Sequence, residues 1–204
     1  MWNASDEHFE AFEEGDYVRV VGTTQLYSGA LQIIATLIER ADPTSIDETE
    51  FRVLTDAAVG RLKQEYEAIA LSVERPCLKL LSDELLADTG LMAALARCPA
   101  GVKQHHAYAG GLLEHVVMLL RLADRVAPLY PDLDRDLLIT GVLLHDIGKT
   151  VELESEKGFS YTEAGQLLGH VLLGLEIVDE KIHAVELRSG EPFDDELANR
   201  IKHM

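Results

Sequence analysis

The pattern of hydrophobic and polar residues divides the chain into a short β-rich segment and a long helical one. Two runs near the N-terminus, "DYVRVVGTT" and "GALQIIATLIE", are rich in β-branched residues, and the "QLYSG" between them offers Ser28-Gly29 as a turn. These runs predict two antiparallel strands within residues 16–38. Because two strands alone are only marginally stable, we expect them to pair with further chain or to pack on the rest of the protein.

From about residue 48 onward, apolar positions recur at helical spacing almost to the end of the chain. After the linker "RADPTSIDETE", Asp47 and Glu50 resemble a capping box for the first helix. A small hairpin is expected within "VELESEKGFSYT", turning near Lys157-Gly158. The predicted helices cover residues 48–72, 76–88, 90–97, 111–128, 134–145, 163–186 and 194–204. The pattern therefore predicts a mainly α protein preceded by a short β-hairpin.

Composition excludes several classes of protein. The 204 residues are 47% hydrophobic and 26% charged, which is typical of a soluble globular chain. No apolar run approaches the roughly 20 residues of a membrane span, and the acidic start "MWNASDEHFE" is unlike a secretory signal. Cys77 and Cys98 form no CxxC motif and favour two reduced thiols, so we expect a cytoplasmic protein that does not associate with membranes.

The net charge of −18 limits what the chain can bind. Phosphate binding is driven by Lys and Arg, so a chain this acidic repels nucleic acid on average. A polyanionic substrate would need a local positive centre, which a bound divalent metal would supply.

Three residues on the two central helices are candidates for holding such a metal. His115 lies beside the apolar face of the 111–128 helix, and His145-Asp146 ends the 134–145 helix. The Pro131-Asp132 turn predicts that these helices are antiparallel neighbours, which would bring the three side chains to one level. Imidazole and carboxylate ligands suit Zn, Mn, Fe or Co. A single His beside an apolar face is more often an ordinary core residue, so the site needs further support.

The remainder of "HDIGK" supplies that support. Gly148 would let the backbone turn sharply, and Lys149 could direct an ammonium group at an anion held by the metal. A Lewis acid combined with a fixed cation is what phosphoryl transfer requires. His170, within "LLGHVLLGLEIV", is a candidate ligand of a second metal that Asp146 would bridge to the first.

These motifs resemble those of the HD-domain metal-dependent phosphohydrolases. The "HDIGK" with a later "GH" resembles the branch in which Lys149 contacts phosphate and His170 binds a second metal. The stretches "HHAYAGGLLEHVVMLLRLA", "DRDLLITGVLLHDIGKTVEL" and "SYTEAGQLLGHVLLGLEIVDEKI" are similar to YhaM-type 3′-5′ exoribonucleases. That resemblance implies an HD-domain helical bundle preceded by a remnant of an OB-fold, with Mn or Co as cofactor.

The resemblance also implies domain limits. Residues 1–42 would be a partial, nucleic-acid-binding OB-fold and residues 47–204 an HD domain. This sequence has no counterpart of three features of the family: the early OB strands, a His-His-Gly segment and the final metal-binding Asp. The sequence is therefore expected to be truncated at both ends.

The predicted site residues fall into three groups. The expected catalytic residues are Asp146 and Lys149. The expected metal ligands are His115, His145, Asp146 and His170. The expected substrate-binding residues are His105, His106, Gly110 and Gly111. For His105 and His106 the alternative is a helix cap with solvent-facing imidazoles. For Gly110 and Gly111 it is a simple hinge. Glu114 is expected to be a surface carboxylate.

Together these features predict metal-dependent phosphodiester hydrolysis. The favoured activity is 3′-5′ exonuclease action on single-stranded RNA, using one or two divalent ions. Single-stranded DNA is the other possible substrate. Manganese is favoured, and Co, Fe, Zn and Mg remain open. The alternatives are a phosphohydrolase for a small nucleotide and an inactive, truncated metal-binding module. The sequence leaves open whether the chain forms a homo-oligomer.

Overall fold

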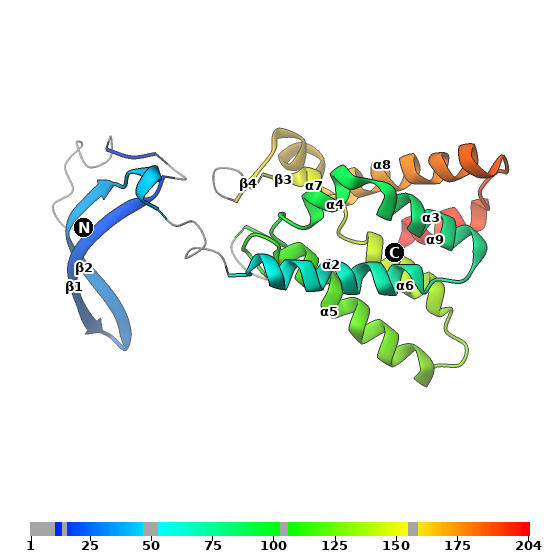
Figure 1. The fold of residues 1–204 in the computed structure, drawn as a ribbon, viewed down its shortest axis with the longest axis horizontal. Helices are drawn as coiled ribbons and strands as arrows, with labels where there is room; N and C mark the ends of the chain where they lie inside the picture. Colours follow the sequence, from blue (N-terminus) through cyan, green and yellow to red (C-terminus); the bar gives the residue numbers. More distant parts are fainter. Residues whose placement is uncertain (1–10, 14–15, 47–52, 103–105, 155–158) are drawn as a thin grey trace. The chain divides into compact units, whose positions relative to one another are not determined.

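The computed structural model consists of two units, residues 1–51 and residues 52–204, which are described separately (Figure 1). The residues that the structure describes are 11–13, 16–46, 53–102, 106–154 and 159–204.

The first unit contains the predicted β-hairpin. Strands β1 (Val18–Tyr27) and β2 (Ala30–Arg40) pair antiparallel along their length. The two residues between them, Ser28 and Gly29, both have positive φ angles, 49° and 81°. Two consecutive positive φ angles are typical of a type I′ turn, whose twist matches that of the flanking strands. The hairpin and its turn are therefore confirmed.

Both strands of the hairpin carry exposed apolar side chains. A pair of strands cannot bury two apolar faces by itself, and within the described residues of this unit those faces are uncovered. The interpretation of residues 1–42 as part of an OB-fold stays a prediction. The exposed apolar side chains are Val18, Val20, Val21, Leu26, Tyr27, Leu31, Ile33, Ile34 and Leu37.

The second unit is helical, with one small sheet. Its helices confirm the mainly α fold that the sequence predicts, and the short pair of strands confirms the second hairpin, whose turn lies outside the described residues. The elements are α2 (Asp56–Leu71), α3 (Pro76–Ala87), α4 (Thr89–Leu95), α5 (Gly111–Val126), η3 (Ala127–Leu129), α6 (Arg135–Leu144), α7 (Lys149–Glu152), β3 (Leu153–Glu154), β4 (Ser160–Tyr161), α8 (Glu163–Ser189) and α9 (Asp195–His203).

The predicted start of the first helix was wrong. The residues just before α2 are not helical, and the Thr55 side chain accepts a hydrogen bond from the Ala58 N–H. Such an N-cap satisfies an amide that the first turn leaves unpaired, and it therefore sets where the helix begins. The expected capping residues Asp47 and Glu50 lie outside the described part of the chain.

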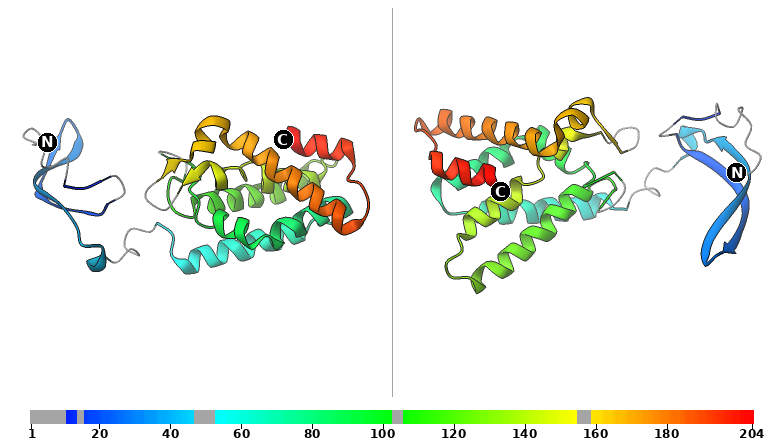
Figure 2. Two further views of the ribbon diagram at one scale, coloured as in Figure 1. Left: turned by 90° about the horizontal axis from the view of Figure 1, so that it is seen from above. Right: turned by 180° about the vertical axis from the view of Figure 1, so that it is seen from behind.

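Helix α5 lies at the centre of the core and carries the first candidate ligand. It packs against α2 and α6, while α8 lies alongside α3 and α9 (Figure 2). Its apolar positions Leu112, Leu113, Val117 and Leu120 have no exposed surface. Burying a leucine side chain stabilises a fold by about 1.5–3 kcal/mol, so α5 is firmly anchored and His115 on it has a fixed position.

Helix α7 is a short element that the sequence pattern did not predict. The chain does turn between α6 and α7 at residues 145–148, but the turn does not need the conformational freedom of glycine, because the φ and ψ of Gly148 are −63° and −19°, which any residue adopts in a helix. A glycine is needed there for space. A Cβ atom at this position would lie 2.0 Å from the His170 carbonyl oxygen and 2.5 Å from the Gly174 nitrogen. Gly148 thus lets α7 pack backbone to backbone against α8.

Both cysteines are free, as the sequence predicts. Cys98 is buried, and its thiol lies 3.2 Å from the Lys149 carbonyl oxygen. Burial raises the pKa of this thiol to about 12, so Cys98 is an inert core residue. The predicted cytoplasmic location stays a prediction.

Candidate metal centre

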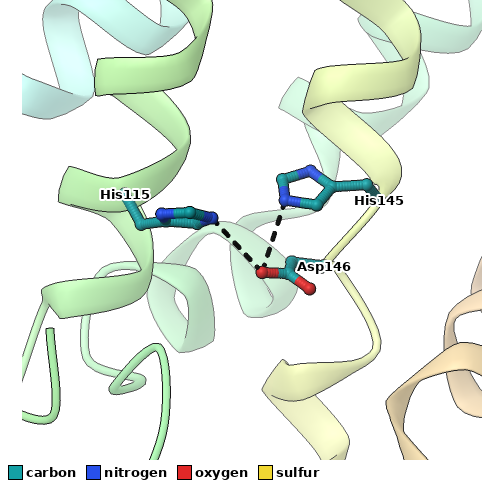
Figure 3. A group of neighbouring side chains, drawn as sticks. All are labelled: His115, His145 and Asp146. Atoms are coloured by element: carbon teal, nitrogen blue, oxygen red, sulfur yellow. Dashed lines mark ion pairs between the residues drawn. The ribbon is translucent and has the colours of Figure 1, made fainter. Parts of the chain in front are cut away.

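Three of the predicted ligands converge at one point. His115 lies on the second turn of α5, and His145 and Asp146 follow the last turn of α6. The Asp146 Oδ2 atom is 3.5 Å from His115 Nε2 and 3.3 Å from His145 Nε2 (Figure 3). One ligand atom from each residue lies within 4.8 Å of the others. The antiparallel pairing of α5 and α6 therefore brings the three side chains to one level, as their spacing predicts.

A backbone contact fixes how His145 faces this point. Its Nδ1 atom is 2.9 Å from the Val142 carbonyl oxygen. Because a carbonyl only accepts, Nδ1 must carry the hydrogen, and Nε2 is the nitrogen that faces Asp146. Nε2 donates to the carboxylate when it is protonated, and it offers its lone pair to a metal when it is not. This is how proteins orient a histidine that binds a metal.

Asp146 is a buried carboxylate with several partners. Only 7% of its surface is exposed. Burial alone raises the pKa of Asp146, but hydrogen bonds from His145 and Lys149, together with their charges, outweigh burial and hold the pKa well below its usual range. Asp146 is therefore ionised and available as an anionic ligand at neutral pH.

The two histidines respond differently to this environment. Burial lowers the pKa of His115, an effect that the Asp146 charge only partly opposes. The hydrogen bond to Asp146 raises the pKa of His145. A neutral His115 keeps a lone pair ready for a cation, as metal ligation requires.

Lys149 contacts the site directly. Its ammonium Nζ lies 2.8 Å from Asp146 Oδ2 and 2.9 Å from the Ala100 carbonyl oxygen. The sequence predicts that Lys149 faces a substrate anion held by the metal; in the structure its ammonium group pairs with Asp146, and its contact with phosphate stays a prediction. The contact shows that the Asp146 carboxylate accommodates a cation.

His170 approaches the other oxygen of Asp146. Its Nε2 atom is 3.7 Å from Asp146 Oδ1, whereas His115 and His145 face Oδ2. One oxygen of the carboxylate thus faces two imidazoles, and the other oxygen faces a third. This arrangement is what a bridging ligand between two metal ions requires.

Glu152 is a site residue that the sequence did not reveal, because it was expected in the hairpin. Its buried Oε1 atom lies 2.9 Å from the His170 backbone nitrogen and 3.1 Å from His170 Nδ1. The positive φ of Gly169, 74°, kinks α8 and turns the His170 amide toward Glu152. Glu152 holds Nδ1 as a donor, so the His170 Nε2 lone pair faces Asp146.

Replacing Glu152 with glutamine is expected to weaken a metal held by His170. The amide can bond through its NH₂ group and release the His170 ring from its present tautomer. Loss of such an outer partner typically costs about 10- to 100-fold in metal affinity or activity. Titration of the second metal by calorimetry measures the effect, and Glu154→Gln, an exposed neighbour, is the control. Equal affinity in both variants would contradict the orienting role of Glu152.

The predicted substrate-binding residues lie beside the cluster, except His105, which lies outside the described residues. The His106 ring centroid is 6.0 Å from that of His115. The cap of α5 is Gly110, without a side-chain hydrogen bond, so His106 is no helix cap.

Glu114 is not the surface carboxylate that the sequence suggested, because it is only 25% exposed and bonds to Tyr108 and His106.

The two glycines at the start of α5 use their amides internally. The Gly110 N–H donates to the Arg97 carbonyl and the Gly111 N–H to the Tyr108 carbonyl. A Cβ atom on Gly111 would lie 1.9 Å from the His106 carbonyl oxygen. The glycines thus permit a close backbone approach, and their predicted contact with substrate stays a prediction.

The donor atoms fit a divalent ion. Two imidazoles and one ionised carboxylate converge, the carboxylate accommodates a cation, and the contact with Val142 directs His145 Nε2 inward. Nitrogen and oxygen ligands of this kind suit Mn, Fe, Co and Zn.

Comparisons with known proteins agree with this geometry. Residues 112–204 match the model of the HD domain family. The 3′-5′ exoribonuclease YhaM of Listeria welshimeri is 29% identical over the whole of this chain, which covers 63% of that protein. The proteins of the same name from Bacillus subtilis and Bacillus licheniformis are 29% and 30% identical over 94% of this chain, which covers 60% of each.

The chain thus spans about three-fifths of the length of these curated relatives. No solved structure matches the chain significantly. Among the described residues, none of the helices combines the length and the apolar character that crossing a bilayer demands.

Proposed function

We propose that this chain, whose residues 112–204 match the model of the HD domain family, is a hydrolase that cleaves phosphate esters at the cluster of His115, His145 and Asp146. The observation that carries this proposal is Asp146, an ionised, buried carboxylate whose two oxygens face three imidazoles and one ammonium group. A divalent ion bound there supplies Lewis acidity and acidifies water for attack on phosphorus.

The residues around Asp146 perform the remaining tasks. His115 and His145 would hold the first ion, and His170, oriented by Glu152, would contribute to a second. Lys149 stays within reach of the bound phosphate and stabilises the charge that develops on its oxygens, as fixed cations do in phosphoryl transfer. The ions and Lys149 together offset the −18 charge of the chain, which otherwise repels a polyanion.

We further propose single-stranded RNA as the substrate, degraded from its 3′ end, with Mn²⁺ as the preferred ion. The support is the name of the similar proteins, 3′-5′ exoribonuclease. Residues 1–42 would then contribute part of an OB-fold that binds the strand. The high negative charge favours a second candidate, a small phosphorylated nucleotide, because a small anion needs less positive surface than a strand.

A metal-reconstitution assay tests the proposal. The chain is stripped with chelator, supplied in turn with Mn²⁺, Co²⁺, Fe²⁺, Zn²⁺ or Mg²⁺, and offered 5′-labelled single-stranded RNA, DNA of the same sequence, or mononucleotides. We expect stepwise shortening of the RNA with Mn²⁺ and loss of this activity in His115→Ala. The matched control is His183→Ala, whose side chain is 69% exposed. Faster hydrolysis of mononucleotides than of RNA favours the second candidate, and no metal-dependent hydrolysis of any substrate rejects both.

A further inference from the structure

The backbone of His106 adopts a conformation that histidine rarely takes. Its φ is 58°, in the left-handed region, which costs a residue with a Cβ atom roughly 1 kcal/mol. The fold holds it there, because the His106 carbonyl accepts hydrogen bonds from the Ala100 and Tyr108 amides at 3.1 and 2.9 Å. Glycine would adopt this conformation without strain. The presence of histidine therefore points to a task for its side chain.

The His106 ring is held on one side by two neighbours. Its Nδ1 atom is 2.6 Å from the Tyr108 hydroxyl and 3.0 Å from Glu114 Oε2. The Tyr108 hydroxyl also donates to the same oxygen of Glu114. His106 and Tyr108 lie in the segment that leads into α5, and Glu114 lies in the first turn of α5.

The hydrogens of this network can be placed by counting donors. The Glu114 carboxylate accepts at Oε2, and Tyr108 has one hydrogen, which it gives to that oxygen. Burial, reinforced by the hydrogen bond to Glu114, raises the pKa of Tyr108 to about 12, so the hydroxyl keeps that hydrogen. The hydrogen between His106 and its two neighbours must then be on Nδ1. In the neutral ring, Nε2 is left as a hydrogen-bond acceptor.

The network borders the metal centre. The His106 ring is 6.0 Å from that of His115, which in turn is 5.5 Å from that of His145. Glu114 directly precedes His115 on α5. A substrate whose phosphate lies at the cluster would therefore have its adjoining sugar within reach of His106.

We propose that Glu114 and Tyr108 are positioning residues that fix His106 as an acceptor for a ribose hydroxyl of the substrate, so that this site prefers ribonucleotides. The inference rests on the proposed function. Phosphate oxygens carry no hydrogen for Nε2 to accept, whereas the 2′-hydroxyl is a donor that DNA lacks. His106 selects the sugar, and Glu114 with Tyr108 keeps its ring in the tautomer that can do so.

The first test observes the His106 ring directly by ¹⁵N NMR of the chelated protein. We expect Nδ1 to carry the hydrogen in the native protein and the tautomers to mix in Glu114→Ala. After the protein is reloaded with diamagnetic Zn²⁺, titration with cytidine 5′-monophosphate should shift the Nε2 signal more than titration with 2′-deoxycytidine 5′-monophosphate does. A bare Nδ1 in the native protein, or equal shifts with the two nucleotides, overturns the proposal. These readouts need no turnover, so they stand even if no hydrolysis is found.

The second test compares kcat/KM on RNA and on DNA of the same sequence. Losing one neutral hydrogen bond, worth about 0.5–1.5 kcal/mol, should lower the preference for RNA by about 2- to 13-fold in His106→Gly and Glu114→Ala. His106→Gly relieves the backbone strain, so its melting temperature should not fall. Glu65→Ala, which removes a carboxylate of α2 that pairs with Arg121 of α5, is the control.

Two results of this comparison overturn the proposal. One is an equal loss on RNA and DNA, which would place the role of His106 at water or phosphate. The other is a loss of metal affinity in Glu114→Ala as large as in His115→Ala, which would make Glu114 a support of the metal centre.

Discussion

Replacing Asp146 with asparagine is expected to abolish metal-dependent hydrolysis. The carboxylate supplies the only negative charge among the three clustered ligands, and its second oxygen faces His170. Removing an outer partner of a metal ligand already costs about 10- to 100-fold, so loss of this central ligand should exceed 100-fold in metal affinity. Calorimetric titration with Mn²⁺ and the RNA-shortening assay measure the two effects. Asparagine keeps the size of the side chain, so the loss reports charge rather than packing.

The matched control for this variant is Asp132→Asn, which removes an equal charge from an exposed position in the turn before α6. It should bind metal and hydrolyse substrate as the native chain does. The role of Asp146 would be rejected by native-like metal binding and turnover in Asp146→Asn. A comparable loss in Asp132→Asn would show instead that net charge controls the assay.

Replacing Gly148 with alanine is expected to produce a large loss of stability. The new methyl group would overlap backbone atoms of α8, the nearest being the His170 carbonyl oxygen at 2.0 Å. Backbone cannot move aside as a flexible side chain does, so we expect a cost of about 3 kcal/mol. In a unit of this size, that cost lowers the melting temperature by about 6–12 °C. It should also move His170 away from Asp146 and weaken a second metal. Thermal unfolding and metal titration measure these effects.

The control is Gly60→Ala, in the middle of α2. No atom lies within 4 Å of the position that its Cβ would take, and alanine in a helix interior is more stable than glycine by about 0.5–1 kcal/mol. The same substitution should thus stabilise one helix and destabilise another. If Gly148→Ala melts no lower than the native chain, α7 and α8 do not pack backbone to backbone.

The sequence by itself determined the elements of the fold and the first three ligands of the candidate site. Helical periodicity predicted the helices from α2 to α9 except α7, because each has a buried apolar face. The "SG" turn predicted the hairpin, because its residues suit the required positive φ angles. His115 and His145-Asp146 could be paired in advance because a short connection forces consecutive helices to run antiparallel. All of these features depend on neighbours in the sequence.

Only the tertiary structure decided which groups support those ligands. Glu152 meets His170 across 18 positions because α7 packs against a kink in α8. Lys149 reaches Asp146 locally, but its second partner, the Ala100 carbonyl, lies 49 positions away. Gly148 was correctly singled out and wrongly explained, since what requires a glycine is the approach of another helix rather than its own φ angle. Contacts between elements depend on how close backbones come, and residue spacing along one element carries no information about that distance.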